Sequence, residues 1–254
     1  MTMRILAIDI GNSNINIGLG SGTLEDTYRY TTDIHRSADE YHGLLKHLFE
    51  GVDTVIIASV VPQLNTTFKT FIQRYFAIDA VFVGPGVKSG VKIQTDNPKE
   101  VGADLVASAA GTIEKYADTA AIVDMGTATT FTALLKREIT GVAITVGLDS
   151  GKDCLIGKAA QLLQFSFETP SAPLGKNTVD ALNAGLLYGH AAQVEGMVGH
   201  IVGDRTDVPV IVTGGASRLI DGLLPSHYIF DEHLVLEGLM VIAKNHAKNT
   251  QRYG

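Results

Sequence analysis

The stretches RILAIDIGNSNINIGL (residues 4–19) and AAIVDMGTATTFTALL (residues 120–135) follow one plan. Each opens with a continuous apolar run, which predicts a strand buried on both faces. Asp, one apolar residue and Gly follow, then a short polar turn and a second strand. Because the same supersecondary unit occurs twice in the chain, the sequence predicts two similar lobes that face a cleft.

The segments between and after these stretches alternate strand and helix patterns, which is typical of an α/β fold. Turn residues separate the first unit from a further strand at 27–31. We predict a first lobe at residues 1–117 and a second lobe at residues 118–254. The other expected strands are 52–62, 80–84 and 208–215, and the expected helices are 38–49, 64–76, 177–203 (one helix or a pair), 218–223 and 234–246.

Composition narrows the function classes. The 254 residues are 45% hydrophobic and 19% charged, with a net charge of −7. This acidic balance argues against a general nucleic-acid or anionic-membrane binder. One cysteine, Cys154, allows no internal disulfide and fits a reducing compartment. The N-terminus lacks a signal-peptide pattern, and no apolar run approaches the roughly 20 residues of a membrane span. We therefore expect a cytoplasmic protein.

The first polar turn carries Asp9, Gly11, Asn12, Ser13 and Asn14. A turn between two strands can aim successive backbone N–H groups at one point, which creates an anion-binding nest. Ser13 and Asn14 can add side-chain donors to a phosphate, and Asp9 at the strand end could hold Mg²⁺ directly or through water. The alternative is a plain hairpin in which Asp and Asn are turn formers.

The second polar turn repeats this arrangement with Asp124, Gly126, Thr127, Thr129 and Thr130. Two matching turns could bracket a polyphosphate from both sides, so the pair indicates nucleotide binding more specifically than either turn alone.

A third candidate site follows the strand VPVIV, where Thr213, Gly214 and Gly215 precede a predicted helix. Glycines at such a junction let a flat base or a phosphate approach the backbone.

Together the three turns resemble the phosphate 1, phosphate 2 and adenosine motifs of the actin and hexokinase superfamily. Within it, the chain resembles type III pantothenate kinases along nearly its whole length. The resemblance implies two RNase H-like lobes with mixed sheets flanked by helices and a nucleotide cleft between them. It rests on DIGNSN, NPKEVGADLVASA (97–109), DMGTATTF (124–131), LGKNTVDALNAGLLYG (174–189), VTGGASRLI and LVLEGL.

The resemblance also implies a function, namely ATP-dependent phosphorylation of pantothenate to 4'-phosphopantothenate in coenzyme A biosynthesis. Asp104 matches the catalytic base, and Gly102 and Ala103 lie beside it in the acceptor site. Thr178 matches a threonine that reaches the acceptor from a partner subunit, which implies a homodimer. Asp9 and Asp124 would hold the Mg²⁺ that accompanies ATP, and the family implies K⁺ or another monovalent cation. The alternative for Asp104 is a carboxylate that complements a helix dipole.

Three features depart from the family pattern, one of which is the segment GVAITVG (141–147), which lacks the proline of the family's Pro-Gly ending. Leu105 stands where the family has arginine, and Thr132 stands where it commonly has the aspartate that we take as the cation ligand. Two further readings therefore stay open: a related kinase for a different small hydroxyl compound, and a non-catalytic nucleotide-binding regulator. The eight histidines lack a metal-binding spacing such as HExxH, and we read them as surface or core polar residues.

Overall fold

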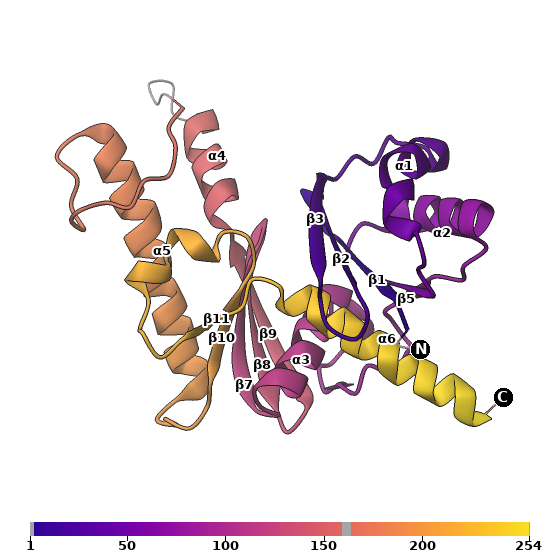
Figure 1. Cartoon of the computed structure of the whole chain (residues 1–254). Coiled ribbons are helices and arrows are strands. Elements are labelled where there is room, and N and C mark those ends of the chain that lie inside the picture. The colour runs from indigo at the N-terminus through magenta and orange to yellow at the C-terminus, as the bar shows by residue number, and fades with distance from the viewer. Residues whose placement is uncertain (1–2, 159–163, 254) are drawn as a thin grey trace. The chain divides into compact units, whose positions relative to one another are not determined.

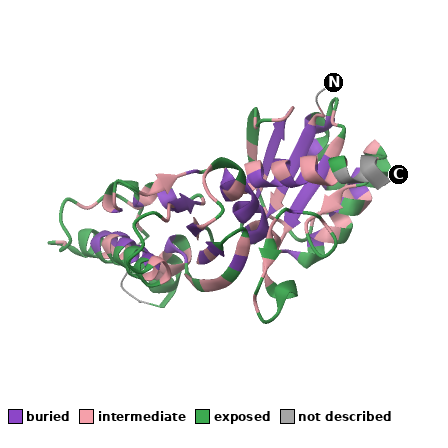
Figure 2. Cartoon of the chain, turned by 90° about the horizontal axis from the view of Figure 1, so that it is seen from below, coloured by how far each residue is buried: buried purple, intermediate pink, exposed green. Residues whose placement is uncertain are grey.

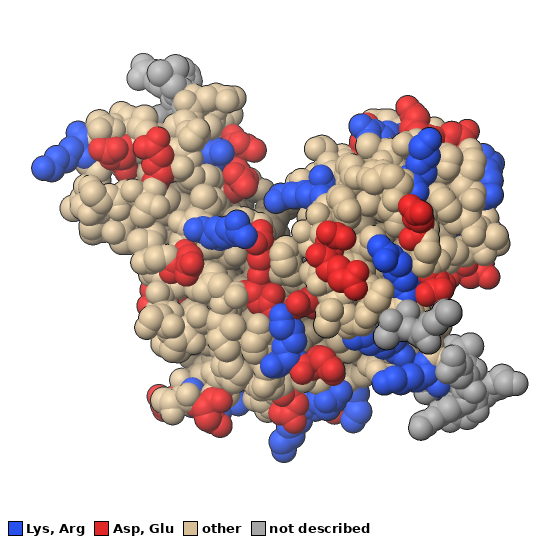
Figure 3. Space-filling view, viewed as in Figure 1, with Lys and Arg blue, Asp and Glu red and all other residues tan. Residues whose placement is uncertain are grey.

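A computed structural model describes residues 3–158 and 164–253 of the chain (Figure 1). The chain divides into two compact units. The first unit comprises Met1–Tyr116 and Leu234–Gly254, and the second comprises Ala117–His233. Among the described residues, no helix is long and apolar enough to cross a membrane. Acidic and basic side chains are interspersed on the face that Figure 3 shows.

The first unit is built on a sheet with the strand order β3-β2-β1-β4-β5. The strands β1, β2 and β3 pair antiparallel, whereas β1, β4 and β5 pair parallel. Their bounds are Ile5–Ile10 (β1), Asn14–Gly20 (β2), Asp26–Thr31 (β3), Thr54–Ser59 (β4) and Val81–Phe82 (β5).

Helices cover both faces of this sheet, and its central strands are buried (Figure 2). Leu6, Ile8 and Ile10 of β1 lie on the face that packs against α1 and α2. The opposite face, which carries Asp9, is covered by α3 and α6. The bounds are Ala38–Leu45 (α1, continued by the 3-10 turn Lys46–Phe49), Pro62–Phe76 (α2), Ala103–Lys115 (α3) and Leu234–Tyr253 (α6), with a short strand Lys92–Ile93 (β6) and a 3-10 turn Pro98–Glu100.

The second unit repeats this topology. Its strands follow the order β11-β10-β7-β8-β9, with β7, β8 and β9 antiparallel and β7, β10 and β11 parallel. The helix α5 packs on the face that carries Val123, Met125 and Phe131. The bounds are Ala120–Met125 (β7), Ala128–Leu135 (β8), Glu138–Val146 (β9), Leu148–Lys158 (α4), Thr178–Val202 (α5), Val210–Thr213 (β10) and Ile229–Phe230 (β11).

The matching strand orders confirm the predicted fold class: two similar RNase H-like units, each a mixed sheet flanked by helices. Within each unit, three strands form an antiparallel meander and two later strands continue the sheet in parallel. The repeated sequence plan supplies the first two strands of each meander, β1 and β2 in one unit and β7 and β8 in the other.

The C-terminal helix is where the structure departs from the predicted lobes. The predicted second lobe was 118–254, but α6 belongs to the first unit and the second unit ends at His233. The reason is close backbone packing between α3 and α6. A Cβ on Gly238 would lie only 1.9 Å from the Ala107 carbonyl oxygen, so this glycine lets the two helices meet. An ion pair between Lys115 and Glu237 adds to the contact.

Two other elements are decided by the structure. Of the two alternatives predicted for 177–203, one helix or a pair, the structure shows one continuous helix, α5, of 25 residues. The helix expected at 218–223 is instead two 3-10 turns, Ser217–Leu219 and Asp221–Leu223. Isolated 3-10 turns suit a segment that must bend sharply after a strand.

Candidate active site

The first polar turn connects β1 to β2 and is tight. The Gly11 N–H donates to the Asn14 carbonyl oxygen over 2.9 Å. A Cβ on Gly11 would lie 3.1 Å from that oxygen, which is why glycine suits the position. Asn12 and Ser13 at the tip are exposed. The turn therefore presents accessible amides and polar side chains, as a phosphate site requires.

Asp9 lies beneath this turn on the α3 and α6 side of β1. The amide of Asn16, which lies opposite Asp9 on β2, donates to the Asp9 carboxylate over 3.2 Å. Burial, followed by the negative charge of Asp104, raises the pKa of Asp9 from 3.8 to about 7, and the Asn16 hydrogen bond partly opposes this rise. A carboxylate kept this far from water favours a cation beside it.

Asp104 is in the first turn of α3, two residues after the N-cap Gly102. Burial raises the pKa of Asp104, while hydrogen bonds from the backbone N–H groups of Leu105 and of Asp104 itself lower it. The Leu105 N–H donates to Asp104 Oδ1 over 2.9 Å. A Cβ on Gly102 would lie 2.2 Å from the same oxygen, so glycine makes room for this carboxylate. The fold brings Asp9 and Asp104 together within the first unit.

The raised pKa of Asp9 has a consequence for stability. Between about pH 4 and pH 7 the folded chain holds a proton at Asp9 that the unfolded chain releases, so Asp9 lowers stability as the pH rises through this window. Asp9→Asn keeps an acceptor for Asn16 and cannot ionise. We expect this variant to be more stable than the parent at pH 8 by on the order of a few kcal/mol.

The measurement is urea unfolding at pH 8 and at pH 4 without nucleotide or divalent ions. The gain should shrink at pH 4, which is close to the unfolded-state pKa of 3.8, because there the folded carboxyl is protonated and the unfolded carboxyl is only partly ionised. Asp26→Asn, at an exposed position on β3, is the matched control and should show no such gain. An Asp9→Asn variant that is no more stable than the parent at pH 8 would contradict this reading.

The second polar turn, between β7 and β8, has the same form. The Gly126 N–H donates to the Ala128 carbonyl oxygen over 3.0 Å. Gly126 and Thr127 are exposed at the tip. A Cβ on Gly147 would lie 2.4 Å from the Gly126 oxygen, so the chain after β9 packs directly against the turn.

Asp124 is the counterpart of Asp9 in the second unit. It lies between Thr130 on β8 and Thr213 on β10 in the sheet register. Among the described residues, the buried hydroxyls of both threonines lack a hydrogen-bond partner. Gly214 has φ +90°, and a Cβ there would lie 2.5 Å from Asp124 Oδ1. Two unsatisfied hydroxyls beside a carboxylate suit a hydrated cation or a bound water.

Thr129 points away from this polar set. Neighbouring residues of a strand face opposite sides, and the Thr129 side chain lies fully buried on the α5 face. Its hydroxyl is 3.0 Å from the Nε2 atom of His190 on α5. Burial lowers the pKa of His190, which favours the neutral imidazole. Only the backbone of Thr129 is thus placed to contact a phosphate at the turn.

The glycine turn after β10 also packs against β7. The Ala216 N–H donates to the Met125 carbonyl oxygen over 3.1 Å, and the Ser217 hydroxyl donates to the Gly214 carbonyl oxygen over 2.7 Å. Gly215 is exposed. The turn therefore leaves backbone open next to Asp124, as an adenosine site would need.

Thr178 begins α5 and is exposed. The Asn177 side chain caps the helix by accepting the Asp180 N–H over 2.9 Å. A pocket of about 390 Å³ lies beside this helix start, lined by residues 168–172 and 174–176 together with Asp180 and Asn183. The segment GKNT thus joins a polar hollow to a helix N-terminus.

Two of the positions that depart from the family pattern, Leu105 and Thr132, are buried. Leu105 is 7% exposed and Thr132 is 1% exposed. Neither side chain is presented to solvent, so Leu105→Arg would place a charge in the core. Lys99 is exposed and lies shortly before α3. Along the sequence, it is the basic residue nearest to Asp104.

A resident metal cluster is not part of the described structure, since those residues contain no group of three or more His, Cys, Asp or Glu side chains that could hold an ion. Mg²⁺ that accompanies a nucleotide needs less, because phosphates and water supply most of its ligands and the protein adds one or two carboxylates. Asp9 and Asp124, both partly buried beside glycine turns, fit that requirement.

Two duplicated units, each with a glycine turn above a partly buried aspartate, define an actin-like ATPase fold. The chain belongs to the type III pantothenate kinase family. The family model "Type III pantothenate kinase" matches residues 5–200. The chain is 41% identical over 248 residues to the type III pantothenate kinase of Anaeromyxobacter dehalogenans (strain 2CP-C), covering 94% of this chain and 98% of that protein. It is 40% identical over 253 residues to that of Exiguobacterium sp. (strain ATCC BAA-1283 / AT1b), covering 96% and 100%.

Solved structures with lower sequence identity support the fold alone. A Campylobacter jejuni structure assigned to the Baf family of transcriptional activators aligns with a TM-score of 0.63 at 19% identity, covering 96% of this chain and 99% of that chain. The activator of 2-hydroxyisocaproyl-CoA dehydratase from Clostridium difficile, solved with bound ADPNP, aligns with a TM-score of 0.60 at 12% identity, covering 99% and 98%.

Proposed function

We propose that this protein phosphorylates pantothenate with ATP to give 4'-phosphopantothenate, the first step of coenzyme A biosynthesis. Membership of the type III pantothenate kinase family over nearly the whole chain is the observation that carries the proposal. The partly buried Asp9–Asp104 pair supplies the chemical support, because two coupled carboxylates can divide metal binding and proton transfer between them.

Asp104 is the proposed catalytic base. The acceptor hydroxyl oxygen attacks the γ-phosphorus, its proton passes to the Asp104 carboxylate, and the bond from the γ-phosphorus to the bridging oxygen breaks to release ADP. Burial raises the pKa of Asp104, which makes the carboxylate a better proton acceptor. Gly102, the N-cap of α3, and Ala103, its first residue, would contact the acceptor.

The phosphate groups would be bound by the two turns. Asn12, Ser13 and Asn14 would contribute amides and side chains together with the backbone of Gly11. In the second unit, Gly126, Thr127 and the Thr129 backbone would bind phosphate, and Gly214 and Gly215 would approach the adenosine.

Asp9 and Asp124 would hold Mg²⁺, which neutralises phosphate charge during transfer. Asp9→Asn is therefore expected to lose turnover by orders of magnitude even though the folded chain becomes more stable at neutral pH.

Leu105 bears on the identity of the acceptor. Arginine at this position could pair with the pantothenate carboxylate, and Leu105 offers no donor. Two functions compete with this proposal: phosphorylation of a different hydroxyl compound, and nucleotide binding without turnover.

The experiment measures ATP consumption with pantothenate, with its uncharged amide analogue and with a panel of other hydroxyl compounds. Preference for pantothenate over the amide supports the proposal, and Lys99→Gln then tests the substitute cation. If only another hydroxyl compound is phosphorylated, that compound is the acceptor. If the protein binds ATP without turning it over, it is a non-catalytic nucleotide-binding regulator.

We further propose that the protein is a cytoplasmic homodimer whose partner contributes Thr178 to the acceptor site. Apolar side chains are exposed near the start of α5, with Leu174 at 84% and Val179 at 44% exposure. Sedimentation equilibrium at assay concentration tests this, and a monomer with full activity would refute it. Activity in K⁺ compared with Na⁺ buffers tests the monovalent cation, for which Thr132 offers no charge.

A further inference from the structure

The first phosphate turn is held from behind by the residue that follows β3. The Thr32 hydroxyl donates to the Gly11 carbonyl oxygen over 2.6 Å. The Thr32 N–H donates to the Ser13 carbonyl oxygen over 3.0 Å. One residue thus fixes the carbonyl groups at both ends of the turn tip.

The second turn is held in the same way by the residues that follow β9. The Gly147 N–H donates to the Thr127 carbonyl oxygen over 3.2 Å, and the Ser150 hydroxyl donates to the same oxygen over 2.7 Å. Ser13 and Thr127 each directly precede the second strand of their meander, and Thr32 and Gly147 each directly follow the third. The two backbone bonds therefore occupy equivalent places in the duplicated units, and each is accompanied by one hydroxyl.

These bonds set the direction of the turn amides. The C=O and N–H of a trans peptide point in opposite directions, and no peptide bond among residues 3–158 and 164–253 is cis. A Gly11 carbonyl aimed at Thr32 therefore turns the Asn12 N–H away from β3. A Thr127 carbonyl aimed at Gly147 and Ser150 turns the Ala128 N–H away from α4. Freed of these bonds, each peptide could rotate and its amide would no longer be preset for a ligand.

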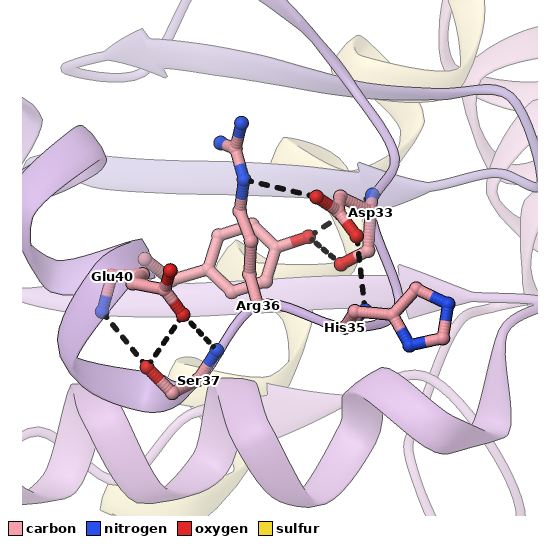
Figure 4. Close-up of polar contacts among 6 residues, drawn as sticks. Asp33, His35, Arg36, Ser37 and Glu40 are labelled. Atoms are coloured by element: carbon pink, nitrogen blue, oxygen red, sulfur yellow. Dashed lines mark hydrogen bonds and ion pairs between the residues drawn. The ribbon is translucent and has the colours of Figure 1, made fainter.

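The segment that carries Thr32 is anchored in the protein core. Tyr41, which is fully buried, donates its hydroxyl to the Asp33 carbonyl oxygen over 2.8 Å. Ser37 and Glu40 form a capping box that begins α1, and Arg36 pairs with Asp33 (Figure 4). The segment 33–40 is therefore fixed at both ends. Thr32 is held in place by this segment, and we infer that it constrains the position of the turn.

We propose that Thr32 and Ser150 are positioning residues that preset the two phosphate turns for nucleotide. The proposal rests on the proposed function in one respect, the identity of the turns as phosphate sites. Neither hydroxyl contacts the reacting atoms; each acts through a peptide group. Loss of either hydroxyl should weaken nucleotide binding and leave acceptor binding unchanged.

The test compares Thr32→Val, which keeps the shape and loses the hydroxyl, with Thr32→Ser, which restores it. We expect Thr32→Val to raise the KM for Mg-ATP by about 10-fold, the effect of one lost hydrogen bond. The KM for the acceptor should stay within about 2-fold, on the same reasoning. Thr32→Ser should return the Mg-ATP value to near that of the parent. Thr31→Val, at an exposed neighbouring position on β3, is the control.

Ser150→Ala tests the second turn in the same assay and should also raise the KM for Mg-ATP selectively. Its control is Thr140→Val, which removes a hydroxyl bonded to the Ala133 carbonyl oxygen over 3.3 Å, away from the turn. Because the two hydroxyls act on different turns, their losses of nucleotide binding free energy should add in the double variant.

Calorimetric titration with a non-hydrolysable ATP analogue and Mg²⁺, without acceptor, separates this proposal from the proposed function. If the protein binds the analogue but does not phosphorylate pantothenate, the proposed function is refuted. The positioning role is still tested in that case, because it is measured by the affinity of the variants for the analogue. Unchanged affinity in Thr32→Val and Ser150→Ala would overturn the positioning. An equal rise in both KM values with a lower melting temperature would assign the hydroxyls a purely structural role. If Thr32→Val fails to fold, Tyr41→Phe, which removes only the hydroxyl that holds Asp33, should weaken nucleotide affinity in the same direction, and unchanged affinity there would count against the proposal.

Discussion

Asp104→Asn is expected to lower kcat for pantothenate by about 10²- to 10⁴-fold, the usual contribution of a positioned general base. The amide has nearly the same size and keeps an oxygen for the Leu105 N–H, which donates to Asp104 Oδ1 over 2.9 Å. It cannot accept the hydroxyl proton. The loss should fall on kcat, while Mg-ATP affinity stays close to that of the parent.

The control is Glu114→Gln, which changes an exposed carboxylate to an amide on the same helix, α3. It should leave turnover unchanged. Single-turnover measurement with saturating pantothenate isolates the chemical step from product release. Turnover of Asp104→Asn within a few-fold of the parent would remove Asp104 as the base. Equal losses in kcat and nucleotide affinity would assign it to metal binding instead.

Gly238→Ala is expected to destabilise the first unit by about 3 kcal/mol or more, as overpacking at a rigid contact does. A Cβ at this position would lie 1.9 Å from the Ala107 carbonyl oxygen and 3.0 Å from the Gly111 nitrogen. Both are backbone atoms of α3, so no side-chain rotation relieves the clash and α6 must move away (Figure 1). Alanine's better helix propensity, roughly 1 kcal/mol, offsets only part of this cost.

Gly43→Ala on α1 is the matched control, because a Cβ there would meet nothing within 4 Å. It should stabilise the chain by about 0.5–1 kcal/mol. Hydrogen exchange of the β1 amides reports the first unit directly. For Gly238→Ala, these amides should exchange faster than in the parent. Unchanged exchange would show that α6 does not need this contact.

Local sequence patterns determined most of the strands and helices, but they left open both the neighbours of Asp9 and the side of the sheet that each turn residue faces. Apolar runs, glycine turns and helical spacing are local signals, and they predicted most strands, most helices and both turns of the duplicated plan, but not the strand β9. Family membership was also readable from short local stretches such as DIGNSN and GKNT.

Side-chain direction could have been read further from the pattern than it was. Thr129 and Thr130 are neighbours on one strand and must face opposite sides. Only Thr130 shares a face with Asp124, and Thr129 instead meets His190 in the core. Counting alternation from Asp124 would have separated the two threonines.

Contacts between distant segments were decided by the tertiary structure. The charge of Asp104 raises the pKa of Asp9 only because α3 packs against β4 and α6 on the face of the sheet that carries Asp9. The placement of α6 in the first unit depends on Gly238 meeting the α3 backbone. Thr32 and Ser150 reach the turns through the third strand of each meander. None of these has a local signature, because each depends on the packing and register of elements that lie far apart along the chain.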